Sequence, residues 1–118
     1  MIAAAILLVF ALQAVPAQKV NIVSVSGCLR ETPPGTWMLV NATDPAPSIA
    51  NAPAKDEIPA TPPVGRHQFK LIGVSEFNLP QQKDHAVIVK GLHIKAEPTD
   101  RINITSVTTI SASCPAAK

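Results

Sequence analysis

The chain has 118 residues, enough for one domain, and 47% of them are hydrophobic, which excludes a wholly disordered protein. Its net charge of +2 comes from ten basic and eight acidic residues. The chain therefore lacks the strong basic field typical of proteins that bind nucleic acid or acidic membranes. Aromatic residues make up only 3%, so the core must rest on Val, Ile, Leu and Ala. A core of this size benefits from a covalent cross-link.

An uncharged apolar run opens the chain, within MIAAAILLVFALQAVPA at residues 1–17. The run is shorter than the roughly 20 apolar residues that span a bilayer, and it is typical of the centre of a signal peptide. Small residues at Val15 and Ala17 predict cleavage after Ala17. We therefore expect a signal-peptide helix at 1–17, one domain at 18–118, no membrane span after cleavage, and a periplasmic or secreted protein. A buried N-terminal helix is the alternative.

The first two strands are predicted at residues 19–29 and 36–43, joined by the turn sequence ETPPG. Gly27 inside the first strand indicates a bulge or a sharp coil. Alternation in the second strand places Trp37 and Leu39 on one face, with Met38 and Val40 on the other. The two segments are expected to form a hairpin.

A proline-rich segment follows at 44–65 and contains six of the twelve prolines. Proline removes backbone donors, so no central strand can run through this segment. We expect a long, exposed, partly extended loop, interpreted as a mobile insertion with a binding loop as the alternative.

Three further strands are predicted at 67–74, 85–94 and 101–113. Phe69 and Leu71 are expected to face inward, and Gly91 indicates another bulge. Between the first two of these strands, residues 75–84 favour one short helical turn, with Ser75 as its cap and Phe77 as an anchor. Leu79 is the second expected anchor.

The two cysteines, Cys28 and Cys114, lie near opposite ends of the predicted domain. An even count in an exported chain favours a disulfide. Two free thiols or a metal site remain open as alternatives. The sequence VSGC at 25–28 also matches a lipid-attachment box, but polar residues separate it from the apolar run, so lipidation is not preferred.

This order of elements predicts an all-β fold. Five strands with one helical turn between the third and the fourth is the order of the OB-fold, a small five-stranded barrel. Glycines within the strands fit the curvature that such a barrel needs. Another small barrel or a sandwich has the same pattern and remains possible.

A sparse set of motifs runs through the predicted domain: Val-x-Gly-Cys-Leu at 25–29, Phe-x-Leu-x-Gly at 69–73, His85 before Val-x-Val-x-Gly at 87–91, and a β-branched strand from Val107 to Cys114. In these motifs the chain resembles small exported bacterial OB-fold-like proteins. Ala86 departs from the pattern, because a glycine is common there, and the proline-rich segment is unusually long. The resemblance implies a fold and a compartment rather than an activity.

Residues able to carry chemistry are few. The three histidines, His67, His85 and His93, show no metal-ligand spacing, and His85 and His93 lie some 26 Å apart at about 3.3 Å per residue along one strand. We expect them at the surface or at strand edges. The carboxylates fall mostly in turns, and no nucleophile elbow or phosphate-binding loop is present. We therefore expect no enzyme, no cofactor and no metal site.

The predicted ligand-binding residues are Trp37, Lys70 and Lys90. Trp37 follows a turn and belongs equally well to the core or to a binding surface. Lys70, Lys90 and Lys95 could gather on one surface, although charges of both signs are interspersed. We expect a non-catalytic binding or structural domain of the bacterial envelope, with a small ligand or an envelope protein as its partner. An OB-type oligosaccharide or oligonucleotide binder is the alternative, although nucleic acid is not the expected partner. A weak histidine-based metal binder is the second alternative.

Overall fold

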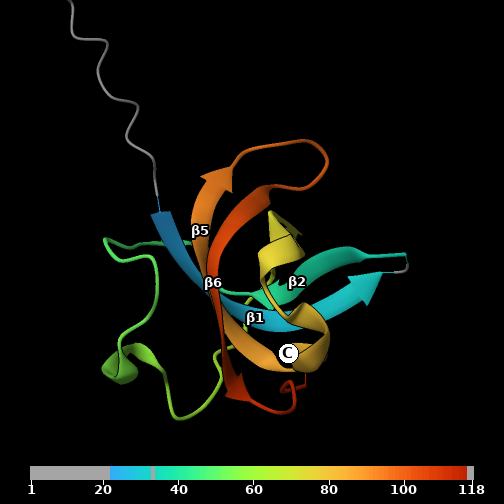
Figure 1. The fold of residues 1–118 in the computed structure, drawn as a ribbon. Coiled ribbons are helices and arrows are strands. Elements are labelled where there is room, and N and C mark those ends of the chain that lie inside the picture. Colours follow the sequence, from blue (N-terminus) through green and yellow to red (C-terminus); the bar gives the residue numbers. More distant parts are fainter. Residues whose placement is uncertain (1–21, 33, 117–118) are drawn as a thin grey trace, which may run out of the picture.

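The computed structural model describes residues 22–32 and 34–116, and the predicted signal helix at 1–17 lies outside them. The described chain is mostly β-structure, with six strands in one sheet and short 3-10 turns (Figure 1). Within these residues, no helical segment has the length and apolar character needed to cross a bilayer. The elements are β1 Ile22–Thr32, β2 Thr36–Ala42, β3 Ala46–Pro47, η1 Lys55–Glu57, β4 His67–Ile72, η2 Val74–Glu76, η3 Leu79–Gln82, β5 Ala86–Ile94 and β6 Arg101–Ser111.

The five long strands pair in a ring. β1 pairs with β5 along its first part and with β2 along its second part, and it changes neighbour at Cys28, which lies opposite both Val40 and Ala86. From β2 the pairing continues to β4, β6 and β5, and so returns to β1. The β4–β6 pairing is parallel and the others are antiparallel. The ring brings the start of β4 beside the connection between β5 and β6.

The five predicted strands are confirmed, with ends that differ by a few residues. The sixth strand, β3, was not predicted; it has two residues and pairs only with β1 at the edge of the sheet, where a proline is tolerated. The predicted helical turn consists of η2 and η3. The prediction of Ser75 as its cap was wrong, because η2 begins after Gly73, which has a φ of 69°, and no side chain caps it.

The core lies inside the ring, and alternation along the strands explains its composition. Trp37 and Leu39 on β2 are buried, while Met38 and Val40 are half-buried, so the predicted division of this strand into two faces is confirmed. Phe69 and Leu71 on β4 also face inward. Of the two predicted anchors, Leu79 belongs to the buried cluster and Phe77 packs against it. The remaining buried members are aliphatic: Val23, Val25, Leu29, Ala42, Val87, Val89, Ile102 and Ile104.

Two glycines within strands, Gly27 and Gly91, allow adjacent strands to approach closely. β1 runs through Gly27 without a register shift, so no bulge forms there. A Cβ atom at Gly27 would lie 2.8 Å from Cγ of Leu39, so a side chain would collide with the neighbouring strand where β1 changes partner. At Gly91 the predicted bulge is confirmed, since the β5–β6 register shifts between Lys90 and Gly91.

The predicted disulfide between Cys28 and Cys114 is confirmed. It ties the point where β1 changes partner to the segment that follows β6. Such a bond is consistent with an oxidising compartment, because cytosolic thiols are normally kept reduced.

Reduction of this disulfide is expected to lower the free energy of unfolding. The bond spans a sequence separation of 86 residues, and the chain-entropy model assigns a loop of this length roughly 4–5 kcal/mol as an upper value. Urea unfolding of the oxidised protein, compared with the Cys28→Ser Cys114→Ser double variant, measures the difference. Equal midpoints for the two proteins would show that the bond does not support the fold.

Candidate functional site

The three predicted ligand-binding residues occupy different environments. Trp37 lies in the core with 6% of its surface exposed. Lys70, on the adjacent strand β4, pairs with Met38 and lies on the opposite, outer face. Lys90 is on β5 opposite Ser106, whereas Lys70 lies opposite Arg101 at the start of β6. The structure therefore brings Trp37 and Lys70 onto adjacent strands but does not gather the three side chains, and their role in binding stays a prediction.

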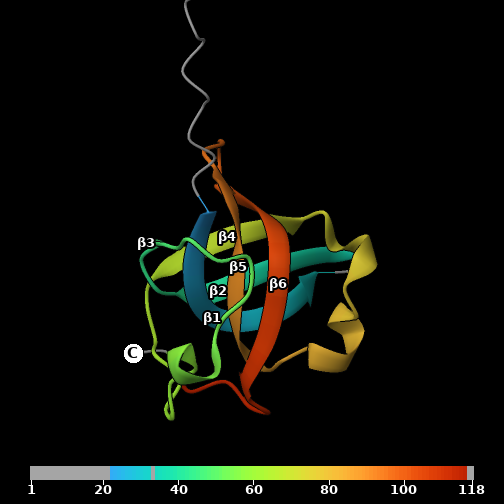
Figure 2. The ribbon, with the colours of Figure 1, turned by 60° about the vertical axis from the view of Figure 1, so that its left-hand side comes forward.

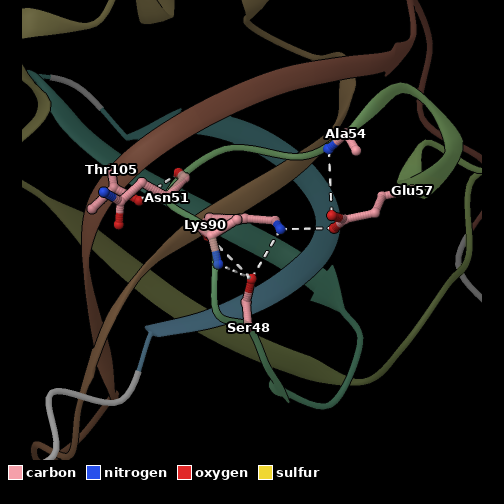
Figure 3. Close-up of polar contacts among 7 residues, drawn as sticks. Ser48, Asn51, Ala54, Glu57, Lys90 and Thr105 are labelled. Atoms are coloured by element: carbon pink, nitrogen blue, oxygen red, sulfur yellow. Dashed lines mark hydrogen bonds and ion pairs between the residues drawn. The ribbon is translucent and has the colours of Figure 1, made fainter.

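Lys90 is buried beneath the proline-rich loop, with 1% of its side chain exposed. Its Nζ atom donates hydrogen bonds to Oγ of Ser48 at 2.9 Å and to Oε2 of Glu57 at 2.7 Å (Figure 3). The other carboxylate oxygen of Glu57 accepts a bond from the backbone N–H of Ala54. An ammonium group removed from water needs such partners, because an unpaired buried charge is strongly unfavourable.

The proline-rich loop at 44–65 is thus fixed across the outer face of the sheet, and Figure 2 shows it passing in front of β5. A further contact joins it to β6, where Oγ1 of Thr105 donates to the carbonyl of Asn51 at 2.8 Å. Its two ends meet, since the N–H of Gly65 donates to the carbonyl of Asn41 at 2.9 Å. The loop is a closed insertion with a narrow neck.

A hollow of about 340 Å³ opens beside this neck, between the start of β4 and the β5–β6 connection. A second, adjoining hollow shares His67 with it and is lined by the two ends of the loop. In the first hollow, the ring of Phe69 lies between two histidines, with ring centroids 6.1 Å from His67 and 5.7 Å from His93. The Phe69–His93 contact is edge-on. The two imidazoles therefore line one cavity.

Each of these histidines is held by an aspartate. His67 pairs through Nε2 with Asp44, the first residue of the loop. His93 donates from Nε2 to Oδ2 of Asp100 at 2.8 Å, and the N–H of Ala96 donates to the other oxygen at 3.1 Å. The hydrogen bond from His93 is the main cause that lowers the pKa of Asp100 from its usual 3.8. Asp100 thus fixes both the imidazole and the turn after β5.

The remaining polar groups give the hollow both donors and acceptors of hydrogen bonds. Gln68, Lys95 and Thr99 line it, and Lys95 has no ion-pair partner in the part of the chain that the structure describes. Its volume falls within the range of small-molecule sites, about 300–1,000 Å³. Residues 22–32 and 34–116 contain no group of three or more His, Cys, Asp or Glu placed to share a metal ion. The hollow can bind a polar ligand by hydrogen bonds and charge.

The sequence did not point to this hollow. In the sequence, His85 and His93 are compared because they flank one predicted strand. His67 and His93 are the histidines that share a cavity. His85 lies elsewhere, with its Nδ1 atom 3.0 Å from Oγ1 of Thr109. The available signal was that two aspartates lie next to strand ends, Asp44 shortly after β2 and Asp100 immediately before β6.

Comparison of the chain with protein-family models, with curated proteins and with solved structures finds no match.

Loss of the Lys90–Glu57 ion pair is expected to release the proline-rich loop. Glu57→Gln removes the charge that faces the buried ammonium, so the backbone amides of the loop should exchange with deuterium faster than in the wild type. Asp56→Asn is the matched control, because Asp56 is a neighbouring acid in the same turn and does not bond Lys90. Exchange measured by mass spectrometry tests this, and equal exchange for the two variants would contradict it.

The same ion pair predicts a pH dependence of stability. Its hydrogen bond from Lys90 lowers the pKa of Glu57 below the usual 4.5. A lowered pKa means that the folded state binds the proton more weakly than the unfolded state. The stabilisation by Glu57 is therefore complete above pH 4.5 and is lost as the pH falls through the lowered pKa. In urea unfolding, the difference between the wild type and Glu57→Gln should be constant near neutral pH and shrink in acid; a difference that grows in acid would refute this.

Proposed function

We propose that the chain is an exported, non-catalytic binding domain of the bacterial envelope, built on a small OB-like barrel, with its ligand site in the hollow around Phe69. One observation carries the proposal: two histidines from different strands, each paired with an aspartate, line one cavity. The Cys28–Cys114 disulfide supports an oxidising compartment. The closed ring of five strands, with helical turns between β4 and β5, supports the OB-like barrel.

The loop at 44–65 contributes to this site through its neck rather than through its tip. Asp44 and His67 flank the neck, and the Lys90–Glu57 pair fixes the rest of the loop against the sheet. The neck supplies Pro45 to the hollow and Asp44 to the adjoining one, and a loop that is already held in place reduces the ordering that a ligand must impose. This arrangement favours a binding loop over a mobile insertion.

The alternatives among binders differ in the kind of contact that they need. Single-stranded nucleic acid binds OB-folds by stacking on exposed aromatic rings. In the described residues Trp37 and Phe69 are buried, and Phe77 is half-buried against the core. The hollow instead offers an amide, a hydroxyl, an ammonium and two imidazoles, which are groups that bind sugar hydroxyls or acids. An oligosaccharide is therefore favoured over an oligonucleotide.

Titration of the purified, oxidised, isotope-labelled protein with a panel of mono- and disaccharides, neutral and acidic, and a single-stranded oligonucleotide tests the proposal by NMR. We expect shifts for one of the saccharides at His67, Phe69, His93 and Lys95. Gln68→Ala should weaken that binding, because Gln68 lines the hollow. Gln81→Ala on η3, outside the hollow, is the matched control and should bind as the wild type. Shifts only around Lys70 or the tip of the loop would move the site elsewhere.

A further inference from the structure

The hydrogen-bonding state of the two histidines determines which ligands the hollow accepts. An ionised carboxylate only accepts hydrogen bonds. Because Asp44 and Asp100 both face the Nε2 atom of their histidine, that nitrogen carries the hydrogen in each ring. In a neutral imidazole the other nitrogen, Nδ1, is then a bare acceptor, and it becomes a donor only when the ring is protonated.

Neither Nδ1 atom has a hydrogen-bond partner in the part of the chain that the structure describes. Within residues 22–32 and 34–116, the hydrogen bonds of His67 and His93 involve Nε2 only. By contrast, His85 engages its Nδ1 with Thr109. Proton uptake by the two rings that line the hollow therefore adds two donors and two positive charges that the fold does not consume.

The charged groups around the hollow are otherwise balanced. Besides the histidines, the charged side chains that line this hollow and the adjoining one are two basic and two acidic: Arg66 and Lys95, and Asp44 and Asp100. Glu97 and Arg101, next along the chain to these linings, add one charge of each sign. Asp44 and Asp100 are occupied by the histidines, and the backbone N–H of Ala96 also bonds Asp100. Two protonated imidazoles beside Lys95 thus turn a neutral region into a positive one.

We propose that the hollow binds a small ligand through an oxyanion group, a carboxylate, sulfate or phosphate, and that this binding is coupled to protonation of His67 and His93. Lys95 supplies a permanent positive charge, and the two Nδ1–H groups supply charge-assisted hydrogen bonds that exist only in the protonated state. Histidine changes its charge between about pH 5 and 8, so affinity rises as the pH falls through this range. The inference rests on the proposed function, because it names the ligand chemistry of the same site.

Isothermal titration calorimetry with galacturonate and with sulfate, at about pH 5.5 and about pH 8, tests the coupling. Both probes keep their charge over this range, and galactose is the neutral counterpart of galacturonate. We expect at least one of the two anions to bind roughly tenfold or more tightly at the lower pH, with net proton uptake seen as a dependence on buffer ionisation enthalpy. Tighter binding of galacturonate would indicate a carboxylate ligand, and tighter binding of sulfate would indicate a sulfate-like ligand. Equal affinity at both pH values overturns the inference.

Variants distinguish protonation of His67 and His93 from other effects of low pH on binding. The double variant His67→Gln His93→Gln should lose the pH dependence, and His85→Gln should keep it, because His85 lies outside the hollow. Lys95→Gln should weaken anion binding at both pH values and leave the pH dependence intact, and it serves as the second test if the double variant does not fold. Loss of the pH dependence in His85→Gln would contradict the assignment.

Failure of this inference is distinguishable from failure of the proposed function. If galactose binds in the hollow as well as galacturonate does, with shifts at Phe69 and His93 and no pH effect, the site stands and the oxyanion coupling is wrong. If no saccharide or anion perturbs these residues at either pH, the assignment of the site is wrong as well.

Discussion

The change of partner along β1 is the constraint on which the ring depends. One strand closes the ring only if it pairs with β5 and then with β2, and both pairings meet at Cys28. The backbone must approach β2 closely at this point, and Gly27 meets this requirement because a Cβ atom would collide with Leu39. The disulfide to Cys114 is attached at the same place. The close approach of β1 to β2 and the disulfide of the domain thus fall on two adjacent residues, Gly27 and Cys28.

A second constraint acts on the outer face. Outward positions on a strand normally meet water, yet Ile88 and Lys90 on β5 are both buried. The proline-rich loop covers Lys90, and its prolines and alanines have little side-chain entropy to lose when they are ordered. The ammonium group of Lys90 then selects one position of the loop, because only Ser48 and Glu57 satisfy it. The buried charge of Lys90 thus favours one placement of the loop, a role documented for buried charged groups in some proteins.

Most of the fold could be predicted from the sequence, because its strands alternate clearly and Gly or Pro residues interrupt them. Trp37, Leu39, Phe69 and Leu71 follow this alternation into the core. The burial of Lys90 could not be predicted, because its partner Glu57 is 33 residues away in a segment without periodicity. The shared cavity of His67 and His93 was also missed, since it depends on the β4–β6 pairing that brings the start of β4 to the β5–β6 connection.

The placement of the two cysteines has a consequence for how the chain acquires its fold. Cys28 precedes nearly the whole of the ring and Cys114 follows its last strand, so no intramolecular bond is possible until every strand has been synthesised. With only two cysteines in the sequence, a single chain has one possible pairing and no wrong one. An intramolecular disulfide therefore cannot form on a chain that lacks any of the strands, and it cannot join the wrong cysteines. Oxidation acts only on a chain in which β1 and β6 are both present.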